Sequence, residues 1–162
     1  MQYYYRDDSR HVISSLHSDS HMTTWHEHFL EMAQLISTRS KDPSTKVGAI
    51  IVDNQRRIIG SGYNGFPRGV DDAPERYQDR PLKLQMVVHA EANAILNAVK
   101  EVKDCTLYCT FFPCPHCAGL IIQSGITSVI AKQNPSDDRY LEQRTISIRM
   151  FAEAHIFWMA VS

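Results

Sequence analysis

Apolar side chains recur along residues 25–38 at intervals of three and four, the spacing that is typical of an amphipathic helix. Thr24 precedes this stretch and Glu27 lies in its first turn, which is the capping-box pattern that begins a helix. The predicted inner face consists of Phe29, Met32, Ala33, Leu35 and Ile36. The pattern therefore predicts a helix that packs one face against a core.

Short apolar runs, typical of buried strands, follow this helix. Residues 47–52 are apolar nearly throughout, which predicts a strand covered on both faces. The polar residues 53–56 indicate a hairpin turn into a second strand over residues 57–63. Three more strands are predicted at residues 106–110, 128–131 and 155–159.

Helical patterns separate these later strands. Good helix formers follow His89, a second helical stretch runs from Cys114 to about Ser124, and a third spans residues 138–152. Helices that alternate with mostly buried strands indicate an α/β fold in which helices cover both faces of a sheet. We therefore predict a three-layer α/β/α sandwich with a mixed five-stranded sheet.

Three candidate metal ligands lie where two of these helices begin. His89 precedes one helix, and Cys114 and Cys117 begin the other, spaced so that both sulfurs can bind one ion. Pro115 falls in the first turn, where a missing amide donor is tolerated. The positive end of the helix dipole favours the thiolates that a metal requires. With three protein ligands, a tetrahedral zinc ion keeps a fourth position for water, as in catalytic sites.

A fourth Cys or His ligand would close this site and make it structural. The candidates are Cys105, Cys109 and His116. His116 lies between the two cysteine ligands and is expected to point away from their shared face, while Cys109 falls within a predicted strand. We favour the open site and keep the closed structural site as the alternative.

Glu91, two residues after His89, gives the predicted metal site a candidate proton shuttle. Zinc can lower the pKa of bound water to about 7, and a nearby carboxylate can take up the proton and pass it on. Hydrolytic deamination needs such a relay, because a ring nitrogen gains a proton and ammonia leaves with another. A solvated helix glutamate without a role is the alternative. The order H-x-E followed by P-C-x-x-C is the signature of zinc-dependent nucleobase deaminases.

Composition refines this interpretation mainly by exclusion. The 162 residues suit one domain with a real core, and the formal net charge of −1 lacks the basic excess typical of nucleic-acid-binding proteins. We find no apolar run of about 18 residues, which a transmembrane helix requires, and no apolar core of a signal peptide. Four cysteines, two of them in a C-x-x-C pair, favour a metal site in the reducing cytoplasm over disulfides.

The first part of the chain has a different character. Ser20, His21 and Met22 resemble a junction between a leader and a native start. We therefore interpret residues 1–22 as an N-terminal extension and residues 23–162 as the catalytic domain. The histidines in and near the extension receive no metal role.

Four runs of sequence, in this order, closely resemble the deoxycytidylate (dCMP) deaminase family: SKDPSTKVGAIIVD, IIGSGYNGFPRGVDD, VVHAEANAIL and TLYCTFFPCPHCAGLIIQSGI. The resemblance covers roughly residues 25–158. The metal motif alone is common to the cytidine deaminase superfamily, whereas the run from Gly62 to Gly65, with Pro67 and Gly69, narrows the resemblance to dCMP deaminases. It implies zinc-dependent hydrolysis of dCMP to dUMP with release of ammonia, a step that feeds dTTP synthesis.

The resemblance also implies a site for the 5′-phosphate. Ser44, Thr45 and Lys46 lie at the start of the first strand, where hydroxyls, amides and an ammonium group could bind it. Tyr140 is a further candidate. For Ser44 and Thr45, an ordinary role in the turn before a strand stays open.

The sugar and base would be bound by other residues. Asn64 would hydrogen-bond the 3′-hydroxyl, the backbone at Ala90 would read the pyrimidine edge, and Phe111 or Phe112 would flank the base. A left-handed turn at Asn64 and a place in the core for Phe112 are the alternatives.

Enzymes of this family are typically homohexamers that dCTP with Mg²⁺ activates and dTTP inhibits. The implied effector residues are Gly65, Phe66 and Arg68, with Asp71 and Asp72 as candidates near the magnesium ion. Residues 64–86 form a longer connection than ordinary loops, which favours a functional insertion over a variable surface excursion. Some relatives carry Cys and His ligands for a second zinc ion in this insertion. None occurs between Asn64 and Val88, so we predict one zinc ion per subunit.

Two other functions stay open. Transfer-RNA adenosine deaminases and other nucleoside deaminases share the metal motif, although the near-neutral charge and the GYNGFP run argue against RNA. A zinc interaction module without catalysis is the alternative from a different class. Such a module would bind zinc but deaminate no pyrimidine nucleotide.

Overall fold

The computed structural model describes residues 3–4, 24–132 and 138–161. The elements are β1 (Tyr3–Tyr4), α1 (Trp25–Ser37), β2 (Gly48–Val52), β3 (Ile58–Tyr63), α2 (Pro74–Gln78), α3 (Arg80–Met86), α4 (Ala90–Leu96), β4 (Thr106–Cys109), α5 (Pro115–Gln123), β5 (Ser128–Lys132), α6 (Asp138–Glu153) and β6 (Phe157–Val161). Apart from β1, the predicted extension of residues 1–22 lies outside the described residues, so its boundary stays a prediction.

The strands form one sheet in the order β1-β6-β5-β4-β2-β3. Strands β4, β5 and β6 run parallel, whereas β2 is antiparallel to both of its neighbours. The predicted mixed five-stranded sheet is therefore confirmed, and the two-residue β1 extends it by pairing antiparallel with β6.

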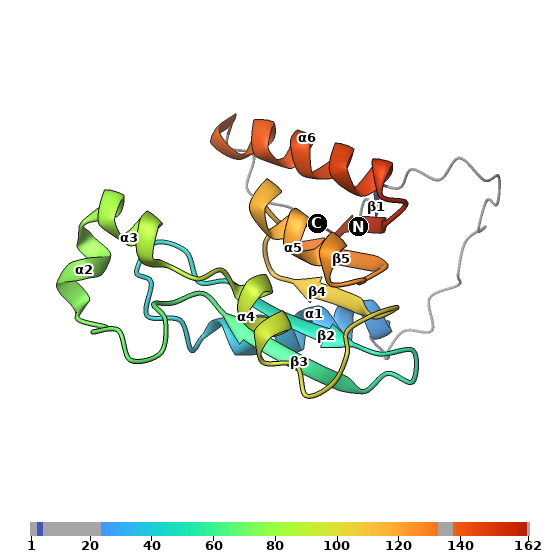
Figure 1. Cartoon of the computed structure of the whole chain (residues 1–162), viewed down its shortest axis with the longest axis horizontal. Coiled ribbons are helices and arrows are strands. Elements are labelled where there is room, and N and C mark those ends of the chain that lie inside the picture. Colours follow the sequence, from blue (N-terminus) through green and yellow to red (C-terminus); the bar gives the residue numbers. More distant parts are fainter. Residues whose placement is uncertain (1–2, 5–23, 133–137, 162) are drawn as a thin grey trace.

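Helices cover both faces of the sheet and give the three layers that the sequence predicts. Ala49 and Ile51 of β2 point to the face covered by α4, α5 and α6. Ile50 and Val52 point to the opposite face, where α1 packs. All positions of β2 are buried, as its continuous apolar run indicates. Figure 1 shows that α2 and α3 instead project from one end of the molecule, beyond these layers.

Helix α1 begins as its sequence predicts. The Thr24 hydroxyl accepts a hydrogen bond from the Glu27 amide at 3.2 Å, and the Glu27 carboxylate accepts one from the Thr24 amide at 2.7 Å. The predicted inner face is wrong at Leu35, whose exposed fraction is 70%, while Leu30 is buried. Ala33 faces β2 at the position of Gly48, and Leu35 lies about 200° further around the helix axis, on the side away from the sheet.

Strand β3 and helix α4 are in direct backbone contact. A methyl group added at Gly62 would lie 2.4 Å from the Ala94 amide nitrogen and 2.5 Å from the Ala90 carbonyl oxygen. Such distances are too short for non-bonded atoms, so only glycine allows this approach. The contact fixes the depth at which the first turn of α4 lies on the sheet.

The segment between β3 and α4 contains two helices that the sequence pattern does not predict. Pro74 begins α2, and the Asp79 side chain caps α3 by accepting a hydrogen bond from the Leu82 amide at 3.1 Å. Each helix is shorter than two full turns, so neither contains enough residues for a helical recurrence of apolar positions to be recognised in the sequence. Backbone pairing between Gly65 and Val88 closes the segment at its base.

We predict that Gly62→Ala lowers the free energy of unfolding by about 2–3 kcal/mol, because the added methyl forces α4 away from β3. Urea unfolding measures this loss. Gly119→Ala in α5 is the matched control, since its methyl would lie 3.8 Å from its nearest neighbour, the Met150 side chain. This control should gain roughly 0.5–1 kcal/mol from helix propensity. A Gly62→Ala protein as stable as the parent would show that α4 is not held by this contact.

Candidate active site

The first turns of α4 and α5 bring the three predicted metal ligands together. His89 is the residue that caps α4, Cys114 caps α5, and Cys117 lies in the first turn of α5 after Pro115. The His89 Nδ1 atom lies 3.5 Å from Cys114 Sγ and 3.4 Å from Cys117 Sγ. A tetrahedral zinc ion with ordinary bond lengths holds its nitrogen and sulfur ligands about 3.6 Å apart. The donor set and its spacing therefore fit zinc.

The cluster consists of three ligands. Their donor atoms all lie within 4.8 Å of one another, and no other such group occurs in the part of the chain that the structure describes. The three possible fourth ligands are not part of it: Cys105 and Cys109 are buried elsewhere in the core, and His116 is exposed on α5. A zinc ion held by these three ligands would keep one position for water or substrate.

The mutual hydrogen bond of the two candidate cysteine ligands shifts their pKa values in opposite directions. The pKa of the Cys114 thiol is lowered to about 4, mainly by a hydrogen bond from Cys117 and also by one with His89. The same hydrogen bond raises the pKa of Cys117, and burial raises it further. The pKa of His89 is raised, chiefly by its contact with the Cys114 sulfur. A bound cation is the group that can hold both sulfurs as thiolates.

Glu91 lies in the first turn of α4, beside this cluster. Its side chain is 4% exposed, which rules out the solvated helix glutamate considered above. Burial raises the pKa of its carboxyl group, while the charge of His89 opposes the shift. A carboxyl group of raised pKa is suited both to accept and to donate a proton near neutral pH.

A cavity of about 530 Å³ opens in front of the cluster and Glu91, a size typical of small-molecule sites. The residues of its wall that the sequence singled out as substrate ligands are Ser44, Thr45, Asn64, Ala90, Phe111 and Tyr140. Phe111 and Tyr140 meet edge to face with ring centres 5.1 Å apart, so one wall is aromatic. Lys46 is exposed and does not line this cavity.

Asn64 is a rigid part of the wall. Its Oδ1 atom accepts a hydrogen bond from the Val47 amide at 2.8 Å, and its Nδ2 atom donates one to the Thr45 carbonyl at 2.9 Å. The backbone is not left-handed here, in contrast to the turn residue Arg56. The amide therefore ties the end of β3 to the start of β2, and each of its polar atoms keeps capacity for one more hydrogen bond.

Residues 23–133 match the sequence model of a known protein family, the cytidine and deoxycytidylate deaminase zinc-binding region. The chain belongs to this family. The matched region contains the His89, Cys114 and Cys117 cluster as well as Glu91, so these residues lie within a zinc-binding deaminase domain.

Individual relatives agree with this assignment. The deaminase is 44% identical to the deoxycytidylate deaminase of Mus musculus over 132 residues, which cover 78% of this chain and 72% of the relative. It is 40% identical to an uncharacterized deaminase from the luxG 3′ region of Aliivibrio fischeri, over 83% of this chain and 92% of the relative. The crystal structure of the dCMP deaminase from cyanophage S-TIM5 in complex with dCMP and dUMP has a TM-score of 0.67 and 26% identity, covering 87% of this chain and all of that one.

The cavity of the deaminase also contains charged residues that sequence reasoning missed. Asp42, Arg80, Lys83 and Arg144 all line it. Arg144 lies over the Phe112 ring at 5.5 Å from its centre, and its Nε atom is buried without a hydrogen-bond partner among the described residues. Asp42 stands within the SKDPST run and could have been noticed there. Lys83 lies on the unpredicted helix α3, so no sequence signal placed it in the cavity.

The candidate effector residues of the deaminase lie outside the cavity. Gly65 pairs with the segment that precedes α4, and Phe66 stacks on Tyr77 of α2 with ring centres 4.4 Å apart. Arg68 is exposed and donates a hydrogen bond to the Asn97 side chain. These three residues thus connect the segment that contains α2 and α3 to both ends of α4.

The two aspartates predicted near a magnesium ion form ion pairs. Asp71 lies 3.5 Å from the Arg76 guanidinium, and Asp72 lies 2.7 Å from the Lys41 ammonium. The hydrogen bond from Lys41 lowers the pKa of the Asp72 carboxyl group. Neither aspartate belongs to a cluster of three or more metal-ligand residues within the described ranges.

We predict that the purified deaminase binds one zinc ion per chain and that Cys117→Ala weakens zinc binding by at least about 100-fold, since even indirect partners of a metal contribute 10–100-fold. Metal analysis after dialysis against a weak chelator measures this loss. Cys105→Ala is the control: this thiol is also buried but lies outside the cluster, so its variant should keep the full zinc content. Equal zinc in both variants would contradict the assignment of Cys117.

Proposed function

We propose that this deaminase hydrolyses dCMP to dUMP and ammonia. The observation that carries the proposal is the position of Glu91 beside a zinc-type cluster, in a cavity whose wall also holds hydroxyl and cationic side chains. A free pyrimidine nucleotide needs both features: a proton shuttle at the ring and a positive region for the phosphate. The solved relative that binds dCMP and dUMP supports the same substrate.

In this proposal Glu91 carries out the proton transfers. When bound, zinc supplies a Lewis acid that makes water a nucleophile near neutral pH. Glu91 takes a proton from the attacking water and gives it to the ring nitrogen beside the amino group. The same carboxyl group then moves the proton of the newly added hydroxyl group to the amino group, so that the C4–N bond breaks, ammonia leaves and the C4 carbonyl forms. Burial suits Glu91 to both directions, because it raises the pKa of the carboxyl group.

The cavity wall supplies the remaining substrate contacts. Phe111 flanks the base, and the Ala90 backbone reads its edge at the start of α4. Asn64 contacts the 3′-hydroxyl with the hydrogen-bonding capacity that its backbone ties leave.

Bound phosphate would contact Ser44 and Thr45, and Tyr140, which lines the same cavity, is a further candidate. Because Lys46 lies outside the wall, we assign the positive charge at this site to Arg80 and Arg144 in its place. The unpartnered Nε atom of Arg144 supports a role as an anion ligand.

We predict that Glu91→Gln lowers kcat for dCMP by at least about 100-fold, because the amide cannot accept a proton. Loss of dCMP absorbance and release of ammonia measure the rate, with deoxycytidine and an RNA stem-loop as comparison substrates. Zinc content should stay at one per chain, and the exposed Glu101→Gln variant should keep the parent rate.

Two outcomes would contradict this proposal. Turnover of the RNA stem-loop in preference to dCMP would identify a transfer-RNA type deaminase. A zinc-loaded parent protein that deaminates no pyrimidine nucleotide would instead indicate a zinc interaction module.

We further propose a cytoplasmic homohexamer that dCTP with Mg²⁺ activates and dTTP inhibits. The grouping of Gly65, Phe66 and Arg68 outside the cavity supports a separate effector site. Exposed apolar side chains such as Leu96 and Val99 support contacts between subunits. None of the four cysteines forms a disulfide, which agrees with a reducing compartment. Within the described residues, no helix combines the length and apolarity needed to cross a membrane.

We predict that dTTP raises, and dCTP with Mg²⁺ lowers, the dCMP concentration for half-maximal rate. Arg68→Ala should reduce both shifts at least about threefold, because a lost charge-assisted hydrogen bond to a phosphate weakens effector binding. Initial rates at low dCMP concentration measure the effect. Arg149→Ala is the control, since this arginine is also exposed but lies on α6. Rates that neither nucleotide changes would refute the regulatory proposal and leave the chemistry intact.

A further inference from the structure

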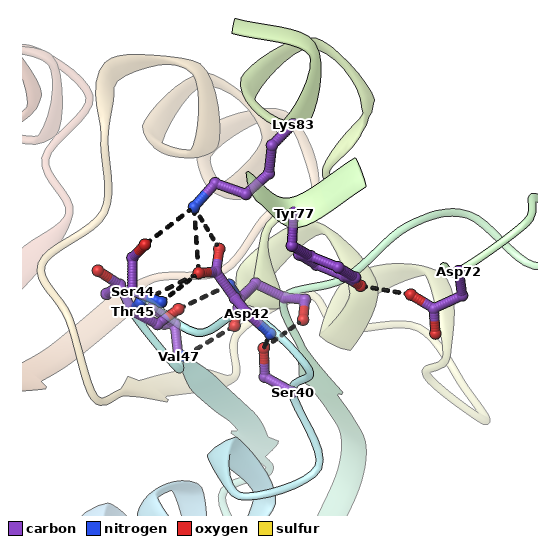
Figure 2. A network of polar contacts seen from close by, with 9 residues as sticks. Ser40, Asp42, Ser44, Thr45, Val47, Asp72, Tyr77 and Lys83 are labelled. Carbon is purple, nitrogen blue, oxygen red and sulfur yellow. Dashed lines mark hydrogen bonds and ion pairs between the residues drawn. The ribbon is translucent and has the colours of Figure 1, made fainter. Parts of the chain in front are cut away.

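A buried ion pair lies in the cavity wall, on elements other than those that carry the metal cluster. The Lys83 Nζ atom of α3 lies 3.1 Å from each carboxylate oxygen of Asp42, in the connection between α1 and β2. The two side chains are 5% and 6% exposed, and both line the cavity. The free-energy cost of removing two charged groups from water offsets most of the attraction between them. A contribution to folding stability is therefore a weak explanation for this buried pair. Figure 2 shows Lys83 reaching down to Asp42 and Ser44.

Asp42 folds the loop that carries the candidate phosphate ligands. Its Oδ1 atom accepts hydrogen bonds from the Ser44 amide at 2.7 Å and the Thr45 amide at 3.2 Å. The Asp42 amide itself donates to the Ser40 hydroxyl at 3.2 Å, and that hydroxyl donates to the Asn64 carbonyl at 2.8 Å. The shape of the loop therefore depends on an acceptor side chain at this position (Figure 2).

The same carboxylate creates an electrostatic conflict with the proposed substrate. The negatively charged Asp42 carboxylate is hydrogen-bonded to the amides of Ser44 and Thr45. The phosphate, which is also negative, is proposed to bind at the same two residues. Like charges repel strongly where little water screens them. Lys83 supplies the opposite charge at this point, and its ammonium group also lies 3.4 Å from the Ser44 hydroxyl.

We propose that Lys83 is a positioning residue that makes this loop acceptable to a phosphate dianion. Asp42 folds the loop, and Lys83 cancels the negative charge that Asp42 brings into the cavity. The inference rests on the proposed function, because it presumes a phosphorylated substrate. It gives helix α3 a defined role: the projecting segment supplies the counter-charge for the loop between α1 and β2, which Lys83 contacts directly.

The test uses the charge of the pair, which is neutral in the parent, negative in K83M, positive in D42N and neutral again in the double variant. The Oδ1 atom of the D42N side chain can still accept the two loop amides, so the fold of the loop is kept. We expect K83M to raise KM for dCMP at least about tenfold, with KM for deoxycytidine changed less than about twofold. K83R should restore most of the affinity. The double variant should have a lower KM for dCMP than K83M.

A structural role without an electrostatic one makes the opposite prediction. In that case K83M and D42N would each raise KM for both substrates alike, the double variant would be the worst, and thermal unfolding temperatures would follow the same order. That result would overturn the inference. Calorimetric binding of dUMP and deoxyuridine to the zinc-loaded proteins gives the same comparison without turnover. The inference is thus tested separately from the deamination of dCMP by the parent protein.

Discussion

Contact between the backbone of α4 and the Gly62 position of β3 is the constraint on which the active site depends. Because no side chain separates the two elements, the start of α4 has a fixed depth on the sheet. His89 and Glu91 lie at that start, so the contact places one candidate metal ligand and the proposed proton shuttle together. The crossover from β4 through α5 to β5 then brings Cys114 and Cys117 to the same end of the sheet. The geometry of the cluster is thus a product of backbone packing.

Buried polar groups of the described residues concentrate at this same end of the molecule. Glu91, Asn64, Asp42 and Lys83 are all buried, and all four line one cavity. Each such group would be destabilising without a partner. The partners present are mostly backbone amides and carbonyls of the neighbouring loop, together with one ion pair. The wall around them is mostly apolar, so these few fixed polar groups can set the orientation of a polar small molecule.

Much of this arrangement could be predicted from the sequence, for identifiable reasons. The continuous apolar run of β2 and the capping box at Thr24 are local signals, and both structures follow from them. Strand β6 begins two residues later than predicted because the turn after α6 extends through His155, whose backbone is left-handed with a φ of 55°. The pair of Asp42 and Lys83 could not be predicted, because residues 41 positions apart meet only through tertiary structure.

The pairing of Gly65 with Val88 affects how the segment between them can change in length during evolution. These two residues are held together by backbone hydrogen bonds of 3.1 and 2.8 Å, directly next to Asn64 on one side and His89 on the other. The distance between the sugar-binding candidate Asn64 and the candidate metal ligand His89 is therefore set by this pairing, whatever the length of the segment between them. Lengthening a loop whose ends are already joined adds little entropic cost. New segments can thus be grafted between these two residues while the chemistry beside them keeps its geometry.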